Sequence, residues 1–342
     1  MNYKKVLIVR VDRLGDVILS TPVIQAVREA LPLSYIAFMT RPYTRGVVAG
    51  NPYLNDVIVY DKDGSHKSFI STIFFAFSLR KYKFDLALIL HSTVRANLIA
   101  FLAGIPRRVG YARKAGWLLT DKMPYVKWQG TKHEIDYTLD VVKAAGINFN
   151  AKNIKLFMPV DKADEDFIAD FLKKNNVSEK DKLVCIHPAA GCVSRIWPAK
   201  KFCELADKLI AETHCKIIIL GIKEELRYAE VIKQNMSQEP IIAKNFTIKQ
   251  TAALLKKCSF LVSTDTGPAH IASAVGTPCI TIFGRKQAGL GPVRWKPIGK
   301  DNVIFHKDVG CAKCAAHKCI KNFLCLDAVT TNEVLDAAKK FI

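Results

Sequence analysis

The sequence lacks any hydrophobic run that approaches the roughly 20 apolar residues needed to cross a membrane. The longest candidate, residues 69–79, is too short, and its apolar side chains on several faces predict a buried helix. Residues 1–5 lead directly into a strand-like segment without a small-residue cleavage site, so no signal peptide is indicated. We therefore expect a cytoplasmic protein whose ten cysteines are reduced thiols.

Acidic residues are also scarce. The 342 residues include 51 Lys and Arg against 31 Asp and Glu, for a formal net charge of +20. This excess suits a polyanionic partner, such as nucleic acid, an anionic membrane surface or a phosphorylated substrate, and charge alone does not choose among them. Half of the residues are hydrophobic, which argues against extensive disorder.

A further absence is the glycine fingerprint G-x-G-x-x-G after the first strand-like run, so no dinucleotide-binding motif is indicated. Short apolar runs instead alternate with helical segments, which is typical of parallel sheets. The expected strands lie at residues 5–11, 35–39, 57–60, 86–90 and 108–110, and then at 183–187, 216–220, 241–242, 260–263 and 279–283. Residues 147–162 resemble a linker, and the length allows two α/β domains.

The most informative stretch is residues 263–270, STDTGPAH, which follows an apolar run. The pattern predicts a strand, a tight turn and a helix, with Thr266 near the N-cap and Pro268 in the first turn. Helix N-termini attract anions, so a phosphate is a natural ligand. The alternatives are an ordinary capped helix and, for His270, a buried histidine with satisfied hydrogen bonds.

A second turn joins the first expected strand to the helix that follows it, where Gly15 precedes Asp16. This turn lies at the carboxyl edge of the predicted sheet, where open α/β sheets bind ligands. Taken alone, Asp16 is either a helix cap or a catalytic carboxylate, and Asp12 is its neighbouring alternative.

Three motifs, taken in order, resemble glycosyltransferase family 9, the ADP-heptose:lipopolysaccharide heptosyltransferases. They are VLIVRVDRLGDV at residues 6–17, HPAAG at 187–191 followed by RIWP at 195–198, and STDTGPAH at 263–270. The resemblance spans roughly residues 4–340. It implies the α/β GT-B fold, in which two Rossmann-like parallel-sheet domains face each other across a cleft. The implied organisation is an acceptor-binding domain over 1–158, a nucleotide-sugar-binding domain over 159–326, and a helix over 327–342 that packs back on the first domain.

The resemblance also implies roles for single residues. Asp16 matches the family's catalytic base, and Arg195 stands where the family has a Lys or Arg that contacts the donor diphosphate. A family Glu that binds the ribose corresponds to Glu224 or Glu225, and we favour Glu224. The other implied donor-binding positions are Thr264, Asp265, Thr266, Gly267 and His270.

A basic segment at residues 107–132 contains seven basic residues, one acidic residue and four interleaved Tyr and Trp residues. This composition suits a phosphorylated glycolipid in a membrane, single-stranded nucleic acid, or a solvated loop. We expect an anionic acceptor to meet basic side chains of the first domain. The candidates are Arg10, Arg13, Arg113 and Lys114.

The carboxyl-terminal part holds a cysteine cluster, made up of Cys311, Cys314, Cys319 and Cys325. Four cysteines in fifteen residues could bind tetrahedral zinc. The spacing fits no common zinc-finger pattern, however, so we favour free or packed thiols and expect no metal site.

The resemblance predicts an inverting glycosyltransferase that moves heptose from ADP-heptose to the core of lipopolysaccharide, of lipid A/Kdo type. Neither a cofactor nor a divalent metal is expected to be essential. The enzyme is expected in the cytoplasm, held peripherally at the inner membrane by electrostatic contact, with no nucleic-acid partner. The alternatives are a GT-B transferase that uses another nucleotide sugar for cell-surface glycans and, more distantly, a basic zinc- and nucleic-acid-binding protein.

Overall fold

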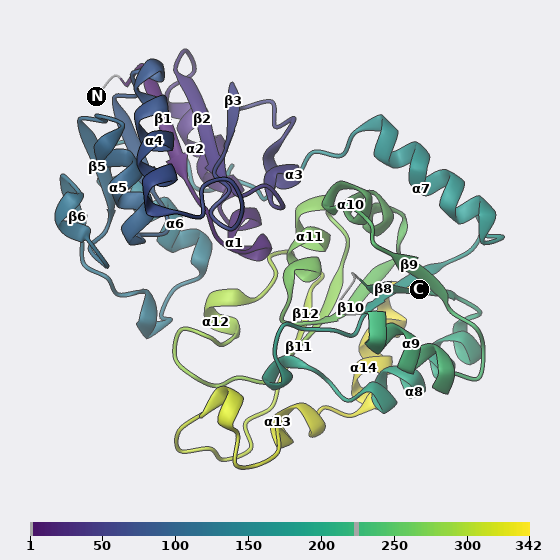
Figure 1. Cartoon of the computed structure of the whole chain (residues 1–342). Helices are drawn as coiled ribbons and strands as arrows, with labels where there is room; N and C mark the ends of the chain where they lie inside the picture. The colour runs from purple at the N-terminus through teal and green to yellow at the C-terminus, as the bar shows by residue number, and fades with distance from the viewer. Residues whose placement is uncertain (1–2, 222–225) are drawn as a thin grey trace. The chain divides into compact units, whose positions relative to one another are not determined.

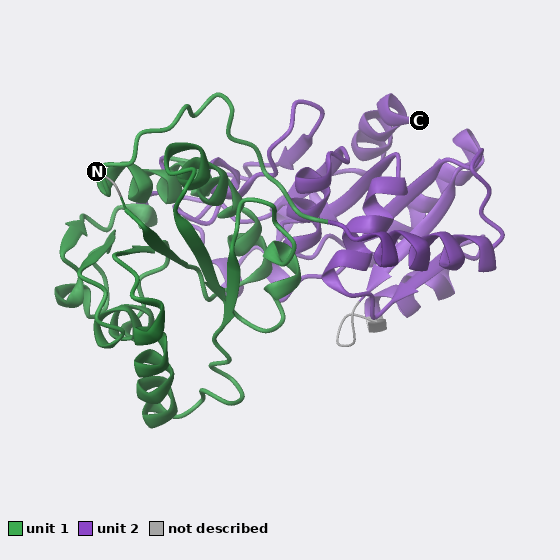
Figure 2. Cartoon of the chain, turned by 90° about the horizontal axis from the view of Figure 1, so that it is seen from above, with its two compact units in different colours: residues 1–128, 132–159 green, residues 129–131, 160–342 purple. Residues whose placement is uncertain are grey.

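The computed structural model describes residues 3–221 and 226–342, and its contacts divide the chain into two units (Figure 2). Unit 1 comprises Met1–Trp128 and Lys132–Pro159, and unit 2 comprises Gln129–Thr131 and Val160–Ile342. The division of the main chain after Pro159 lies one residue beyond the expected boundary. Among the described residues, no helix is both long and apolar enough to cross a bilayer.

Unit 1 contains a six-stranded parallel sheet in the order β3-β2-β1-β4-β5-β6 (Figure 1). Its strands are β1 (Lys5–Val9), β2 (Tyr35–Thr40), β3 (Asp56–Val59), β4 (Leu86–Ile89), β5 (Arg107–Tyr111) and β6 (Asp121–Met123). Its helices are α1 (Leu14–Ile18), α2 (Thr21–Ala30), α3 (Arg45–Val48), α4 (Phe69–Ser78), α5 (Val94–Leu102) and α6 (Glu134–Ala144), with 3₁₀ helices η1 (Leu79–Tyr82), η2 (Gly116–Leu118) and η3 (Lys127–Gln129).

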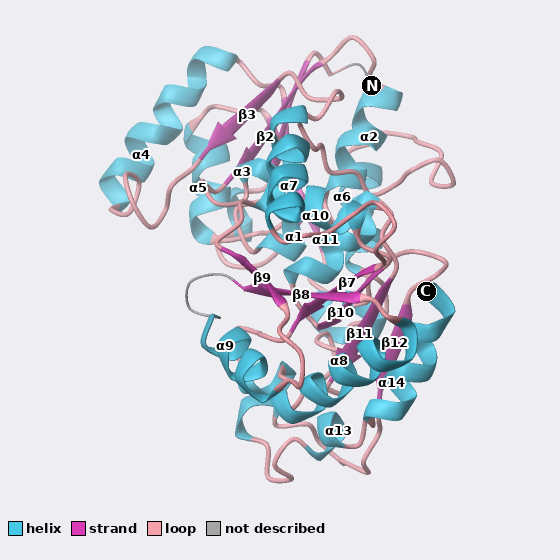
Figure 3. Ribbon diagram, turned by 90° about the vertical axis from the view of Figure 1, so that its right-hand side faces the viewer, coloured by secondary structure: helices cyan, strands magenta, loops and turns pink. Residues whose placement is uncertain are grey.

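Unit 2 contains a second six-stranded parallel sheet, in the order β12-β11-β10-β7-β8-β9 (Figure 3). Its strands are β7 (Leu183–His187), β8 (Lys216–Gly221), β9 (Ile241–Lys244), β10 (Phe260–Thr264), β11 (Cys279–Phe283) and β12 (Val303–His306). Its helices are α7 (Lys162–Lys174), α8 (Ala199–Thr213), α9 (Leu226–Asn235), α10 (Ile248–Lys257), α11 (Gly267–Val275), α12 (Pro292–Trp295), α13 (Leu324–Asp327) and α14 (Thr331–Ala338), with 3₁₀ helices η4 (Val193–Arg195), η6 (Ala316–Lys318) and η7 (Lys339–Phe341).

The two sheets have the same topology. In each, the first three strands run outward from the centre and the fourth returns to pair with the first, so the strand order reverses between β1 and β4 and between β7 and β10. Ligands of open α/β sheets bind at such reversals, beyond the carboxyl ends of the strands. The shared topology therefore marks one candidate site in each unit, at the ends of these strand pairs.

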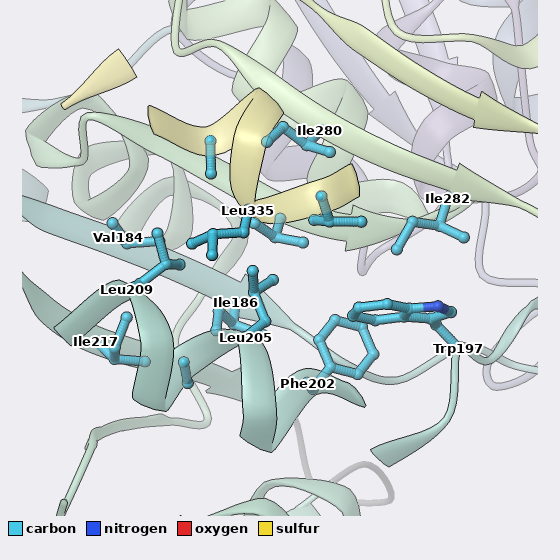
Figure 4. Packing of buried hydrophobic residues seen from close by; sticks show 14 of the residues in the cluster. Val184, Ile186, Trp197, Phe202, Leu205, Leu209, Ile217, Ile280, Ile282 and Leu335 are labelled. Atoms are coloured by element: carbon cyan, nitrogen blue, oxygen red, sulfur yellow. The ribbon is translucent and has the colours of Figure 1, made fainter. Parts of the chain in front are cut away.

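The core of unit 2 explains where the last helix packs. Trp197 is fully buried, lies edge-on to Phe202 with ring centroids 4.9 Å apart, and donates its indole N–H to the Val329 carbonyl at 3.1 Å. Leu335 of α14 belongs to the same hydrophobic cluster (Figure 4), and Lys208 of α8 donates to the Asn332 side chain at 2.8 Å. The expectation that residues 327–342 pack on the first domain is therefore wrong, because the apolar face of α14 is buried against α8 within unit 2.

Three further local features differ from the sequence expectations. The edge strands β6 and β12 were not expected: β6 (DKM) has no apolar run, and β12 (VIFH) has only a short one. The helix expected after Asp16 is two helices, and Pro22 stands in the first turn of the second. Helix α4 was expected to be buried, but Phe69, Ile70 and Phe74 on it are exposed.

Candidate active site

The reversal point of unit 1 is occupied by a buried arginine surrounded by carboxylates. Arg10, just beyond β1, is 2% exposed. Its guanidinium pairs with Asp12 at 3.0 Å, with Asp16 at 2.5 Å and with Glu134 at 2.9 Å. Its Nη1 also donates to the Leu90 carbonyl, which follows β4, at 3.3 Å. One guanidinium thus links the ends of the two central strands to the first residue of α6.

Arg10 was expected to bind acceptor phosphates, and the structure contradicts this. The side chain is buried, and Nε, Nη1 and Nη2 all donate to groups of the protein itself. A guanidinium committed in this way orients carboxylates and stabilises their charge. Of the other acceptor candidates, Arg13, Arg113 and Lys114 are exposed, and the Arg113 guanidinium lies 4.8 Å from the centre of the Tyr125 ring.

Glu134 is fully buried and is held by two cations. Its Oε1 accepts from Arg10 and from the Lys127 ammonium, each at 2.9 Å, and Lys127 also donates to the Leu90 carbonyl at 3.2 Å. A buried charge is stable only with such partners. The sequence analysis did not single out Glu134, and it included Lys127 only as part of the basic segment at residues 107–132. No local pattern could have found the pair, because their partner Arg10 is more than a hundred residues away in the chain.

His91 lies beyond β4, and its Nδ1 pairs with the second oxygen of Asp12 at 2.8 Å. Tyr43 donates its hydroxyl to the Asp12 backbone carbonyl at 3.0 Å. Both side chains are partly exposed next to the carboxylates, so they are placed to line the approach to them. Neither was identified from the sequence.

The two aspartates have opposite pKa shifts. Burial disfavours the charged form of both, but Arg10 and His91 hold the pKa of Asp12 below its usual range. At Asp16, burial and the neighbouring charge of Asp12 outweigh Arg10 and raise the pKa to about 6. A carboxylate with this pKa is largely ionised at neutral pH and is a better proton acceptor than an ordinary aspartate. The site therefore provides one carboxylate held in its charged form, Asp12, and one that takes up a proton more readily, Asp16.

The reversal point of unit 2 lies where β10 leads into α11. Thr266 is the N-cap residue, and its backbone is extended, but its side chain does not bond the helix backbone as expected of a cap. The hydroxyl instead contacts His187 Nδ1 at 3.1 Å and Ser263 Oγ at 3.0 Å. Thr266 thus makes no side-chain cap hydrogen bond to this helix end, and a helix N-terminus is a favourable place for an anion.

Two arginines converge on Asp265 beside this helix end. Arg195 donates to its backbone carbonyl, and Arg285 to its carboxylate, each at 2.7 Å. Burial raises the pKa of Asp265, while the two arginines oppose the rise. Arg195 also donates from Nε to the Cys192 sulfur at 3.1 Å. The expected Arg195 is thus at the site, and Arg285, which no motif indicated, lies there too.

The remaining expected donor residues are distributed as follows. Thr264 ends β10 and donates its hydroxyl to the Ala189 carbonyl at 3.3 Å. Gly267 opens α11, and His270 is buried within the first turn of the helix. Glu224 and its alternative Glu225 lie outside the described residues.

The cysteine cluster lines a single pocket together with Lys286, Lys307 and Lys321. The Cys325 thiol donates to the Gly284 carbonyl at 2.8 Å, and none of the ten cysteines forms a disulfide. Among the residues described, no group of three or more His, Cys, Asp or Glu side chains is arranged to hold a metal ion.

Solved structures share this architecture over nearly the whole chain. A glycosyltransferase of family 9 from Veillonella parvula superposes with a TM-score of 0.88 at 22% identity, covering 100% of this chain and 98% of that one. ADP-heptose lipopolysaccharide heptosyltransferase II of Escherichia coli gives 0.79 at 18% identity, with 98% of each chain covered. Two parallel sheets of this topology define a GT-B fold, and the charged groups at both reversal points suit a glycosyltransferase.

Sequence comparison identifies the glycosyltransferase family to which the chain belongs. The family model described as "Glycosyltransferase family 9 (heptosyltransferase)" matches residues 74–324. The chain therefore belongs to glycosyltransferase family 9 and is a glycosyltransferase. Lipopolysaccharide core heptosyltransferase OpsX of Haemophilus influenzae is 26% identical over 312 residues, which cover 88% of this chain and 84% of that protein. Lipopolysaccharide heptosyltransferase 2 of Escherichia coli is 21% identical, covering 84% and 85%.

Proposed function

We propose that the protein transfers heptose, with inversion, from ADP-heptose to the core of a lipopolysaccharide acceptor. Support comes from the family and from relatives named lipopolysaccharide heptosyltransferases. A heptosyltransferase of Escherichia coli with the same fold, at 19% identity and a TM-score of 0.74, has been solved with ADP, and again with an ADP-heptose analogue at 18% identity. The observation that carries the proposal is the carboxylate cluster around Arg10, with Asp16 as its base.

In this mechanism Asp16 accepts the proton of the attacking acceptor hydroxyl. The acceptor oxygen forms a bond to the anomeric carbon, the bond from that carbon to the diphosphate breaks, and ADP leaves with the electron pair. Attack from the face opposite the leaving group inverts the anomeric centre. Asp12 stays ionised beside Arg10 and His91. Its negative charge opposes the effect of the Arg10 guanidinium on Asp16 and so helps to keep the pKa of Asp16 raised.

The leaving diphosphate develops negative charge, which the unit 2 site can stabilise. The uncapped N-terminus of α11 and the Arg195 guanidinium are fixed positive groups beside Asp265. We infer that these groups make a divalent metal non-essential. Initial rates with and without excess EDTA test this: unchanged rates are expected, and loss of activity that Mg²⁺ restores would contradict it.

Anionic groups of the acceptor require cations near Asp16. Burial, together with the nearby positive charge of Arg41, lowers the pKa of Lys62, and Asp12 and Arg13 also interact with this lysine. Like charges gathered in this way favour an anionic ligand. We propose that the exposed Arg13 and the partly exposed Lys62 contact the acceptor phosphates, whereas the Arg41 guanidinium pairs with Asp63. A lipid-linked acceptor also places the enzyme at the cytoplasmic face of the inner membrane.

A panel of nucleotide sugars tests the donor. Initial rates with ADP-, UDP- and GDP-sugars and a lipopolysaccharide-core acceptor are expected to show turnover with ADP-heptose alone, and NMR of the product is expected to show an inverted anomeric centre. Turnover with a UDP- or GDP-sugar instead would favour the alternative, a GT-B transferase for another cell-surface glycan.

A further inference from the structure

Helix α4 carries an apolar face that points to solvent. Ile70, Phe74 and Phe77 follow the spacing i, i+4, i+7, which places them on one side of the helix, and they are 67%, 69% and 42% exposed. A surface helix normally turns polar residues outward and buries such a stripe. Contiguous exposed apolar surface of this kind marks an interaction site.

The opposite face of α4 shows that the helix is not simply misoriented. Thr72 and Ala76 are fully buried there, and the Thr72 hydroxyl lies 2.8 Å from the Tyr60 hydroxyl. The Ser68 side chain caps the helix by accepting from the Ser71 N–H at 3.0 Å. The small and polar residues thus fix α4 on unit 1 together with Phe75, and Phe69, Ile70, Phe74 and Phe77 are left outward.

The exposed surface continues from α4 onto α5, which lies beside it in Figure 1 and packs against it. Arg80 lies over the Phe77 ring at 4.5 Å and donates to the Leu102 carbonyl at the end of α5 at 2.9 Å. Arg108 lies over the exposed Phe101 ring at 5.4 Å. We call this surface the aromatic patch. Its members are Phe69, Ile70, Phe74, Phe77 and Phe101.

Arg108 also connects the aromatic patch to the basic segment. Its Nε donates to the Leu118 carbonyl at 2.7 Å, next to Trp117, whose side chain is 75% exposed. Trp at the border between apolar and basic surface is typical of the membrane–water interface, where its ring lies at the headgroup level.

Basic residues predominate along the segment that carries the patch. Residues 64–120 contain nine Lys and Arg but a single acidic residue, Asp85. The carboxylate of Asp85 accepts from the backbone N–H groups of Lys4 and Lys5 at the start of β1, at 2.7 and 3.2 Å. The basic residues are Lys67, Arg80, Lys81, Lys83, Arg95, Arg107, Arg108, Arg113 and Lys114. An apolar surface on a segment with this excess of cations is complementary to an anionic bilayer.

We propose that the aromatic patch inserts into the headgroup region of an anionic phospholipid bilayer, with the outward face of α4 entering first. Long Lys and Arg side chains at its border reach the phosphates while their stems cover apolar surface. This contact is hydrophobic as well as electrostatic. It extends the proposed function and rests on it, because the lipid-linked acceptor is what brings the enzyme to a bilayer.

The test is flotation of the full chain with vesicles of phosphatidylethanolamine and phosphatidylglycerol, compared with vesicles of phosphatidylcholine alone. The double variant Ile70→Ser, Phe74→Ser is expected to bind the anionic vesicles at least about tenfold more weakly, since two largely exposed apolar side chains no longer enter the bilayer. Leu33→Ser, which changes a fully exposed apolar residue outside the patch, is the matched control and is expected to bind like the wild type.

A charge variant separates the two contributions. Lys81→Gln is expected to weaken binding to anionic vesicles by about fivefold and to leave binding to phosphatidylcholine unchanged. Circular dichroism of each variant verifies folding. Sedimentation velocity tests the other occupant: wild-type dimers that the double variant converts to monomers would show a contact between copies and overturn the proposal. Binding of the double variant to anionic vesicles as tightly as the wild type would also overturn the proposal.

Heptosyl transfer to a water-soluble, delipidated acceptor keeps the two proposals apart. The double variant is expected to retain wild-type rates in this assay, because the patch contains no residue of the carboxylate cluster. A wild-type protein that binds vesicles but transfers no heptose would refute the proposed function and leave the aromatic patch standing, whereas transfer without vesicle binding would do the reverse.

Discussion

The base role of Asp16 predicts a specific pH dependence of transfer. With a pKa of about 6, Asp16 takes up a proton as the pH falls below neutrality. Only the ionised carboxylate can accept the proton of the acceptor hydroxyl, so kcat/KM is expected to decline as the pH falls through this value. At higher pH it should reach a plateau.

The size of this effect distinguishes the raised pKa from an ordinary one. At a pKa of about 6, about nine-tenths of the carboxylate is ionised at pH 7 and about one-tenth at pH 5, so kcat/KM should fall nearly tenfold between them. An aspartate at its ordinary value of 3.8 would remain more than about 90% ionised at pH 5, and the rate would hardly change. Because Asp12 and Asp16 interact, the measured value belongs to the pair.

The assay is direct chromatography of released ADP, which needs no coupling enzyme with its own pH dependence. Asp16→Asn is expected to lower kcat by about two orders of magnitude or more and to abolish the decline at low pH, while ADP binds with nearly unchanged affinity. Asp136→Asn, at an exposed position in α6, is the matched control. A flat wild-type profile between pH 7 and pH 5, or normal turnover of the Asp16 variant, would refute the reasoning.

Three other perturbations test the unit 2 site and core. Arg195→Ala is expected to weaken ADP binding by about tenfold or more, because a charge-assisted contact to phosphate is lost; calorimetry that finds unchanged affinity would remove Arg195 from the donor site. Arg285→Ala leaves the buried Asp265 carboxylate without its ion-pair partner, and a thermal midpoint lowered by several degrees is expected, against no shift if the pair is unimportant. Leu335→Ala should cost about 2–5 kcal/mol in urea unfolding of unit 2 followed by Trp197 fluorescence, whereas the exposed Asp336→Ala should have little effect; equal midpoints would mean that α14 contributes nothing to the core.

The sheets were predictable from the sequence because their central strands are buried on both faces. Residues 183–186 and 260–262 of these strands are apolar and buried throughout, so they stand out from flanking helices. The edge strands β6 and β12 are only partly buried, and no such pattern identified them. The prediction that α4 is buried was wrong for a related reason. Apolar residues on several faces of a helix lead to burial only if each of those faces packs against the core.

The candidate sites were predictable only in part. A residue that follows a central strand, such as Asp265 directly after β10 or Asp16 in the short helix after β1, can be placed near the sheet edge from its position in the chain alone. The contacts that such a site makes cannot be placed in this way, because Glu134 and Lys127 reach the site around Arg10 only through tertiary packing. For the same reason the sequence suggested a free, phosphate-binding role for Arg10. The local motif contains the arginine but not the buried carboxylate that engages it.

The charge balance of the carboxylate cluster bears on the proposed role of Asp16 as a proton acceptor. Two buried cations, Arg10 and Lys127, face three carboxylates, so the cluster carries an excess negative charge when Asp16 is ionised. Glu134 pairs with both cations, Arg10 is shared with Asp12 and Asp16, and Asp12 has a further partner in His91. Of the two aspartates, Asp16 is the one whose pKa is raised, because its burial and the neighbouring charge of Asp12 outweigh its pairing with Arg10. Accepting the proton of the acceptor hydroxyl neutralises this excess, which means that the arrangement favours the protonated state of Asp16 that transfer produces.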